Sequence, residues 1–168
     1  MMKVAVFLDF ANINAGSRNM NCNINYGALL DYLADESEDR TLSVAYAYVP
    51  IDPRTEHMMD STIEELWRSG YVVKSKVGTL AGDSYKCDFD VEITLDITRV
   101  AYGNMPDVVV IVSGDVDFVP VVLDLRGRGI RVEIAAFTSS MSHHLALRSS
   151  GYINLDLLLD QDSAEENS

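Results

Sequence analysis

The chain has 168 residues, of which 26 are acidic and 13 basic, so its formal net charge is −13. This length suits one domain with a sizeable core, and no apolar run is long enough to cross a bilayer. The negative charge argues against a general nucleic-acid binder, and two cysteines do not indicate a disulfide framework or a zinc site.

The first part of the chain predicts two strands joined by a loop and a helix. The apolar run from Val4 to Leu8 predicts a central strand that ends at Asp9. The asparagine-rich stretch from Asn14 to Asn25 predicts a loop. Apolar residues at helical spacing predict a helix over residues 26–33, and a strand follows over residues 42–49. The chain starts its first strand at once, so we expect no signal peptide and a cytoplasmic, reduced protein.

The middle of the chain predicts two further helices around a strand. Thr55 to Ser69 has one apolar side and predicts a helix. Tyr71 to Val77 alternates and predicts a strand near a sheet edge, because Lys74 and Lys76 share its polar face. A polar loop is expected over residues 78–86, and then a helix that Asp88 or Asp90 caps and that runs to about Tyr102.

The segment from Val108 to Phe118 combines a buried strand with a polar end. Its apolar run, Val108 to Val112, has no alternation and predicts a strand buried on both faces. Asp115 and Asp117 follow at the point where the strand gives way to a helix. The later elements are expected to be a helix at 118–126, a strand at 130–137, a helix at 142–148 and a strand at 152–155.

This alternation predicts an α/β fold with a doubly wound, mostly parallel central sheet of five or six strands. We expect a single domain over residues 1–160 and a disordered acidic tail over 161–168. If the strands 4–8 and 108–112 are neighbours, Asp9, Asp115 and Asp117 gather at the edge where such sheets bind ligands.

Carboxylates gathered in this way repel one another unless a cation or a proton offsets their charge. Mg²⁺ and Mn²⁺ prefer hard oxygen ligands, so either ion is the expected cofactor. Some of these acids have a structural alternative to binding a metal ion. Asp115 would cap a helix, Asp96 would be a solvated helix position, and Asp88 would be a cap or an exposed residue. The candidate metal ligands are Asp9, Asp90, Asp96, Asp115 and Asp117.

Other polar residues would surround such an acidic centre. Asn12 lies just past the first strand, where it joins the ligand shell or makes a turn. Three roles are expected for Ser113: it donates a hydrogen bond to a carboxylate, it donates one to a substrate phosphate, or it completes the turn. Basic side chains hold phosphates or remain ordinary solvated charges. The candidate substrate-binding residues are Asn12, Ser113, Lys74, Lys76 and Lys86, with Arg18 as a further basic candidate.

Three sequence elements together resemble the NYN domain family of the PIN-like nuclease superfamily, and most of all its LabA-like proteins. They are DFANIN from Asp9, K-x-x-x-D-V-x-x-x-x-D from Lys86, and SGDVDF from Ser113, within a resemblance that covers residues 3 to 155. The segment after Lys86 is one residue longer than the family's usual Lys-Gly-x-Asp, and its spacing to Asp96 favours Asp90 over Asp88. The resemblance implies a PIN-like fold and a metal-dependent ribonuclease site at Asp9, Asn12, Asp90, Asp96, Asp115 and Asp117.

The leading hypothesis is therefore a Mg²⁺- or Mn²⁺-dependent RNA endonuclease with Asp9, Asp96, Asp115 and Asp117 as catalytic residues. The alternative is a non-catalytic regulatory module that keeps the acidic pocket and binds RNA or protein. It would bind a protein partner, which is another protein or a second copy of the chain, through the Met58/Met59 helix or an exposed edge strand. A small-molecule phosphatase is disfavoured because Asp9-Phe10-Ala11 lacks the second aspartate of a DxD motif. A dehydrogenase is disfavoured because no Gly-x-Gly-x-x-Gly follows the first strand.

Overall fold

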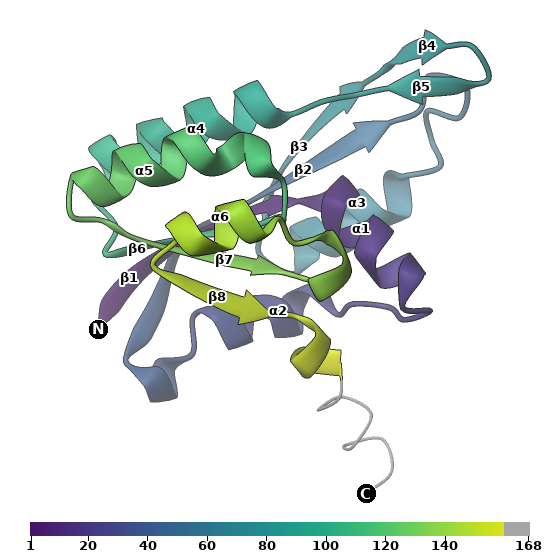
Figure 1. Ribbon diagram of the computed structural model, residues 1–168. Helices are drawn as coiled ribbons and strands as arrows, with labels where there is room; N and C mark the ends of the chain where they lie inside the picture. The colour runs from purple at the N-terminus through teal and green to yellow at the C-terminus, as the bar shows by residue number, and fades with distance from the viewer. Residues whose placement is uncertain (160–168) are drawn as a thin grey trace, which may run out of the picture.

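A six-stranded parallel sheet forms the middle of the protein, for which a computed structural model describes residues 1–159 (Figure 1). The α/β fold with a parallel sheet of five or six strands is thereby confirmed, and the strand expected nearer an edge is the edge strand β3. The strands, in spatial order, are β3 (Val72–Val77), β2 (Arg40–Ile51), β1 (Met2–Asp9), β6 (Val108–Val112), β7 (Arg131–Ala136) and β8 (Gly151–Asn154).

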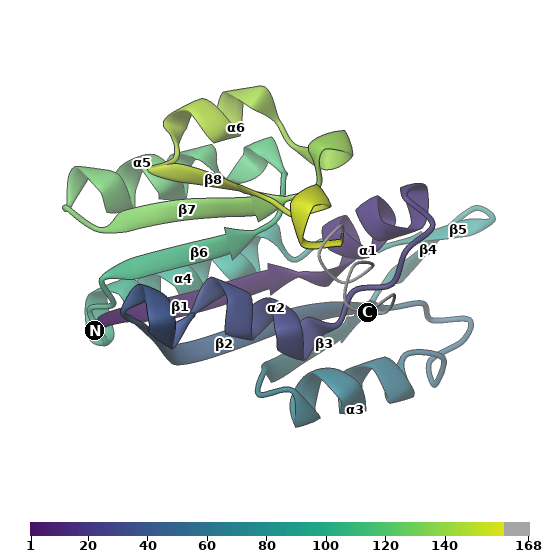
Figure 2. The same cartoon turned by 90° about the horizontal axis from the view of Figure 1, so that it is seen from below.

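Helices cover both faces of this sheet (Figures 1 and 2). The side chains of β1 alternate between two cores: Val4, Val6 and Leu8 face one, and Ala5 and Phe7 face the other. The first core is closed by α1 (Phe10–Asn19), α2 (Tyr26–Leu33) and α3 (Asp60–Arg68), and the second by α4 (Asp90–Gly103), α5 (Val119–Gly127) and α6 (His143–Arg148). None of the helices within residues 1–159 is both long and apolar enough to cross a membrane.

The two apolar runs of the sequence form the centre of the sheet. β1 and β6 pair in parallel from Val4 opposite Val108 to Leu8 opposite Val112. The chain places β2 and β3 on one side of β1 and then returns to place β6 on the other side. This change of direction makes the carboxyl ends of β1 and β6 a topological switch point, the usual ligand site of open α/β sheets.

Two of the expected segments are wrong in detail. The segment 14–25, expected to be a loop, is helical as far as Asn19, because Ile13 and Gly16 are buried against the sheet and packing outweighs local propensity. Any side chain at position 16 would meet Phe137, since an added Cβ would lie 2.5 Å from its ring. The helix expected from Thr55 begins only at Asp60, because residues 52–60 form successive turns through i−3 backbone bonds.

Apart from a 3₁₀ turn just before β2, the remaining short elements follow the carboxyl ends of β3, β6 and β7. The loop expected over 78–86 contains an antiparallel hairpin that turns at Gly82, whose φ of +64° favours glycine. The acidic tail expected over 161–168 lies outside the described residues. The short elements are β4 (Thr79–Ala81), β5 (Ser84–Lys86) and the 3₁₀ turns η1 (Glu36–Glu38), η2 (Val116–Phe118) and η3 (Thr138–Ser140).

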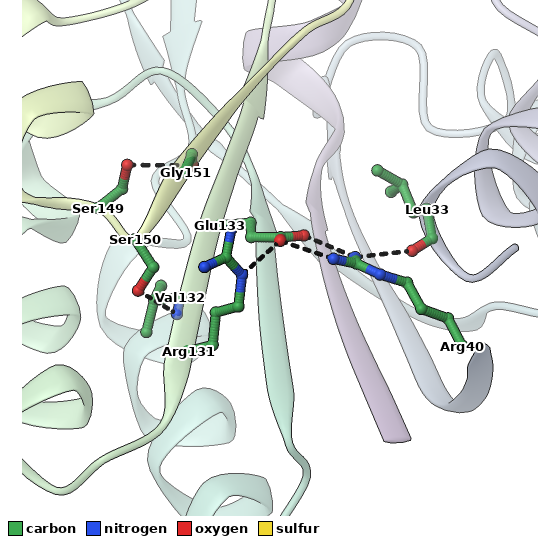
Figure 3. A network of polar contacts seen from close by, with 8 residues as sticks. All are labelled: Leu33, Arg40, Arg131, Val132, Glu133, Ser149, Ser150 and Gly151. Carbon is green, nitrogen blue, oxygen red and sulfur yellow. Dashed lines mark hydrogen bonds and ion pairs between the residues drawn. The ribbon is translucent and has the colours of Figure 1, made fainter. Parts of the chain in front are cut away.

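A buried ion-pair network ties β7 to the start of β2 (Figure 3). Glu133 is only 3% exposed, and both of its oxygens accept hydrogen bonds from Arg40, at 2.7 and 2.8 Å. Arg131 donates a further bond of 2.8 Å, and Arg40 also reaches the carbonyl of Leu33. Burial would raise the pKa of Glu133, but the hydrogen bonds from the two arginines outweigh it and hold the pKa below its ordinary value.

We expect Arg40→Ala to lower the free energy of unfolding by about 3 kcal/mol, since it leaves a buried carboxylate without its main partner. Arg131→Ala is the matched control, because the Arg131 side chain is 49% exposed and should cost about 1 kcal/mol or less. Urea unfolding near neutral pH measures both, and equal losses would contradict the assignment. Because the folded pKa is lowered, this contribution is present above the ordinary glutamate pKa and is lost as the pH falls through the folded value.

Candidate metal centre

The carboxyl ends of β1 and β6 bring the first aspartates together. Asp9 is the last residue of β1, and Ser113, Gly114 and Asp115 follow β6 directly. The two strands are parallel neighbours, so these residues meet at one edge of the sheet (Figures 1 and 2). Asp90 reaches the same edge as the first residue of α4.

One carboxylate oxygen from each of Asp9, Asp90 and Asp115 lies within 4.8 Å of the other two. Opposite ligands of an octahedral magnesium ion are about 4.2 Å apart, twice the usual ion–oxygen distance, so a small inward shift would let one ion touch all three. The group lines an open hollow of about 350 Å³, with room for water ligands. The donor set therefore fits a hard divalent cation such as Mg²⁺ or Mn²⁺. Also lining the hollow are Asn12, Asp88 and Asp117.

Hydrogen bonds behind the hollow fix these carboxylates. The Ser113 hydroxyl donates to Asp9 at 2.9 Å and accepts from the backbone N–H of Asp115 at 3.2 Å. Ser113 is fully buried, and of its three expected roles it has two: it bonds a carboxylate and it completes the turn before Asp115. The Asn12 side chain accepts from the Gly114 N–H at 3.0 Å, and Asp115 accepts from the Asp117 N–H at 2.9 Å.

Gly114 is required by the close approach of a neighbouring segment. A Cβ at this position would lie 2.1 Å from the carbonyl oxygen of Ser140. The Gly114 carbonyl in turn accepts a hydrogen bond of 3.0 Å from the Ser142 N–H. The turn that carries Asp115 is therefore held against the segment between β7 and α6, which limits its freedom to relax away from Asp9 and Asp90.

The carboxylates of Asp9, Asp90 and Asp115, here called the group of three, destabilise one another electrostatically. Burial, the charge of Asp115 and a hydrogen bond to Asp117 raise the pKa of Asp90 from 3.8 to about 8. Burial also raises the pKa of Asp9, against the opposing hydrogen bond from Ser113. Without a cation, Asp90 therefore holds a proton at neutral pH, and a bound cation would take over the role of that proton.

Asp96 does not join this group. It lies six residues after Asp90 on α4, which places it about 9 Å further along the axis and on a different side of the helix. Its carboxylate, 6% exposed, accepts hydrogen bonds from the Tyr48 hydroxyl at 2.8 Å and from Lys74 at 2.7 Å. Arg99 adds a longer contact of 3.5 Å. The expected approach of Asp96 to Asp9 and Asp115 is thus not seen, because protein cations and a phenol already satisfy its charge.

The lysines differ in how their charges are matched. Lys74 pairs with Asp96 and Lys76 with Glu92, both at 2.7 Å. Lys76 also donates a hydrogen bond to the backbone carbonyl of Asp88, so it holds the loop before α4 in place. Lys86 is exposed on β5 and forms no ion pair within residues 1–159. Of the three predicted substrate-binding lysines, Lys86 is the one with an uncompensated charge.

Sequence reasoning did not identify Tyr48, and it left two structural roles open for Asp88. A tyrosine in a central strand needs a partner for its hydroxyl when buried, and this signal would have pointed to a nearby polar residue such as Asp96. Asp88 accepts a hydrogen bond of 2.7 Å from the backbone N–H of Asp90. It thereby orients the start of α4, as the capping alternative anticipated, and leaves Asp90 in the group of three.

The sequence matches the model of the NYN domain family over residues 3–156. No curated protein matches the chain. Among solved structures, the chain is similar to the crystal structure of a protein of unknown function from Vibrio parahaemolyticus, with a TM-score of 0.75 and 26% sequence identity. The similarity covers 92% of this chain and 93% of that chain, so the two proteins share the fold over nearly their whole lengths.

We expect the metal-free protein to lose thermal stability as the pH rises from about 4 to about 8, relative to Asp90→Asn. The folded state holds the Asp90 proton in this window while the unfolded chain, with the ordinary pKa of 3.8, releases it. Discounted for solvent screening, the effect is on the order of 1–2 kcal/mol, or about 2–8 °C in melting temperature. Melting curves at several pH values measure it, with Asp31→Asn, an exposed site on α2, as the control.

Excess Mg²⁺ or Mn²⁺ should then raise the melting temperature of the wild-type protein at pH 8, because the ion binds only the folded group. The rise should be much smaller in Asp90→Asn and unchanged in Asp31→Asn. An equal rise in all three proteins would mean that the ion acts elsewhere, and no rise in any would argue against a metal centre.

Proposed function

The chain belongs to the NYN domain family, and we propose that it is a ribonuclease that hydrolyses RNA phosphodiester bonds with Mg²⁺ or Mn²⁺ as cofactor. The family has a nuclease-like fold, and the acidic group lies at its switch point. The single observation that carries the proposal is the approach of Asp9, Asp90 and Asp115 to within 4.8 Å of one another. Carboxylates brought so close without a protein cation are suited to a bound metal ion and a phosphate.

Each residue of the site has a separate role in this proposal. A bound divalent ion would supply activation of water and stabilisation of charge on the phosphate oxygens. Asp9, Asp90 and Asp115 would hold the ion, and Ser113 would keep Asp9 oriented towards it. Asp117 is exposed and within hydrogen-bonding reach of Asp90, so it would accept a hydrogen bond from the attacking water.

The surroundings of the hollow favour an endonuclease that binds RNA weakly. Exposed side chains, including Asp88 and Asp117, border the hollow and leave room for a strand that continues past the cleaved bond. Lys86 would contact the phosphate backbone, whereas Lys74 and Lys76 would contribute less because carboxylates match their charges. With a net charge of −13, the protein would not attract a polyanion over long distances.

A non-catalytic module that binds RNA or protein through the same hollow is the second candidate. The observation that favours it is the charge balance: two of the three candidate lysines are already paired, and Asp96 is committed to Tyr48 and Lys74. Such a module would bind a divalent ion and still perform no hydrolysis. Metal binding and cleavage therefore have to be measured separately.

We expect Asp115→Asn to lower the rate of RNA cleavage by at least about 100-fold, because it removes one of three charged ligands while preserving side-chain shape. The Asn side chain can still accept the Asp117 N–H bond, so the fold should persist. RNA binding should be unchanged or tighter, since one negative charge near the phosphate is removed. Cleavage and binding of labelled RNA are measured side by side, with Asp31→Asn as the matched control.

Cleavage that survives in Asp115→Asn would contradict the ribonuclease proposal, as would activity that does not follow the protein through successive column fractions. Binding without cleavage in the wild-type protein, retained in Asp115→Asn, would favour the non-catalytic module. Loss of cleavage in both Asp115→Asn and Asp31→Asn would point to a general loss of folding or purity.

A further inference from the structure

A second hollow of about 300 Å³ adjoins the acidic one. Ala11 lines both hollows, so the two share a border at the start of α1. The second hollow is enclosed by α1 on one side, by the turns after β2 on another, and by the β4–β5 hairpin. Its lining residues are Phe10, Ala11, Asn14, Ala15, Arg18, Pro50, Asp52, Thr55, Met58, Met59 and Tyr85.

One face of α1 forms the floor of this hollow. Ala11, Asn14, Ala15 and Arg18 are spaced at i, i+3, i+4 and i+7, which places them on the same side of a helix. The two alanines leave space, and the floor runs about 10 Å from Ala11 to Arg18 at the usual helical rise. Because α1 follows directly after Asp9, this floor leads away from the metal centre without interruption.

The chemistry of the second hollow differs from that of the first. Phe10, Met58 and Tyr85 provide aromatic and apolar walls, and Asn14 offers one amide donor and one acceptor. The Asp52 carboxylate is matched by Arg54, with contacts of 2.7 and 2.9 Å. Within residues 1–159, no carboxylate pairs with Arg18, so the hollow presents one uncompensated positive charge beside an acidic site.

Tyr85 and Arg18 lie close enough to influence each other. Burial raises the pKa of the Tyr85 hydroxyl, the charges of Asp52 and Cys87 raise it further, and the charges of Arg54 and then Arg18 oppose this rise. Both side chains line the second hollow. Aromatic rings and guanidinium groups are the side chains on which unpaired bases usually stack. The Arg18 charge can also meet a phosphate that follows the base.

We propose that the second hollow binds one nucleobase of a single-stranded nucleic acid, next to the phosphate at the acidic hollow. The base stacks on Tyr85, its edge meets Asn14, and Arg18 contacts the adjoining backbone. This inference rests on the proposed nuclease function and adds that the substrate is single-stranded, because a base in a duplex would first have to lose its pairing and stacking to enter the hollow. An apolar protein side chain would leave Arg18 and Asn14 without partners, which makes a base the better occupant.

The test compares the binding of hexanucleotides in which single bases have been removed one at a time. All proteins carry Asp115→Asn, so that binding is measured without cleavage, with Mg²⁺ present and by fluorescence anisotropy. One abasic position should weaken binding by roughly tenfold or more, as expected for the loss of one stacked base. In Tyr85→Ala, intact and abasic oligonucleotides should bind alike.

Further variants separate the loss of stacking from the loss of folding. Tyr85→Phe keeps the ring and should bind within about twofold of the parent protein. Ala15→Leu fills the hollow without removing any contact and should weaken binding as Tyr85→Ala does. Tyr32→Ala, at an exposed tyrosine on α2 outside the hollow, is the matched control and should bind normally. Melting curves of each variant confirm that the fold is retained.

The outcomes distinguish this inference from the proposed function. Cleavage by the wild-type protein with no effect of Tyr85→Ala or Ala15→Leu on binding would overturn the base site and leave the nuclease standing. Binding that depends on Tyr85 without cleavage would support the base site and overturn the enzyme. A DNA hexanucleotide with the same dependence on Tyr85 would also support the base site, whereas no binding of either nucleic acid would overturn it.

Discussion

Repulsion among the carboxylates of Asp9, Asp90 and Asp115 is the constraint on which the site depends. Negative charges so close together separate unless the surrounding structure prevents it, and here the restraint comes from the middle of the fold. The paired strands β1 and β6 are buried on both faces, so the positions of Asp9 and Asp115 are set by the centre of the sheet. The close contact of Gly114 with Ser140 prevents the second strand end from moving away. The raised pKa of Asp90 follows from this repulsion and from burial, because a bound proton removes one negative charge just as a bound cation would offset it.

Two other buried acids show how this fold treats a carboxylate that it uses for structure. Glu133 receives hydrogen bonds from Arg40 and Arg131, and Asp96 receives them from Tyr48 and Lys74. In both places the protein supplies the counter-charge, and the acid joins distant segments: β7 with β2 in one case, α4 with β2 and β3 in the other. The group of three receives hydrogen bonds from a hydroxyl and from backbone N–H groups but no ion pair within residues 1–159. This difference in partners separates a structural acid from a candidate ligand more reliably than position in the sequence does.

The same difference explains what could be predicted from the sequence. The unbroken apolar runs 4–8 and 108–112 identify the two central strands, and the aspartates that follow them meet because parallel neighbours end at the same edge. Asp96 was expected at that edge from the family motif, but the motif says nothing of its partners Tyr48 and Lys74, which lie on the strands β2 and β3. Asparagines over 14–25 suggested a loop, whereas contacts of Ile13 and Gly16 with the sheet make α1 helical as far as Asn19. In both cases long-range packing decided the outcome, whereas a sequence shows only local patterns.

The helical state of α1 affects where a polyanion such as RNA would bind on this acidic protein. With a net charge of −13, electrostatic attraction to RNA has to be local, and the metal centre repels a phosphate until a cation is bound. As an extended loop, residues 14–19 would not place Ala11, Asn14 and Arg18 on one face. As a helix they form a continuous floor from the acidic hollow to the Arg18 guanidinium group, which pairs with no carboxylate of residues 1–159. A nucleic acid on that floor would meet a cation at one end and an aromatic ring nearby, so contacts beside the metal centre would offset the charge of the rest of the molecule. Binding and chemistry would then depend on one another through α1, because its first turn borders the metal ligands and its last turn carries Arg18.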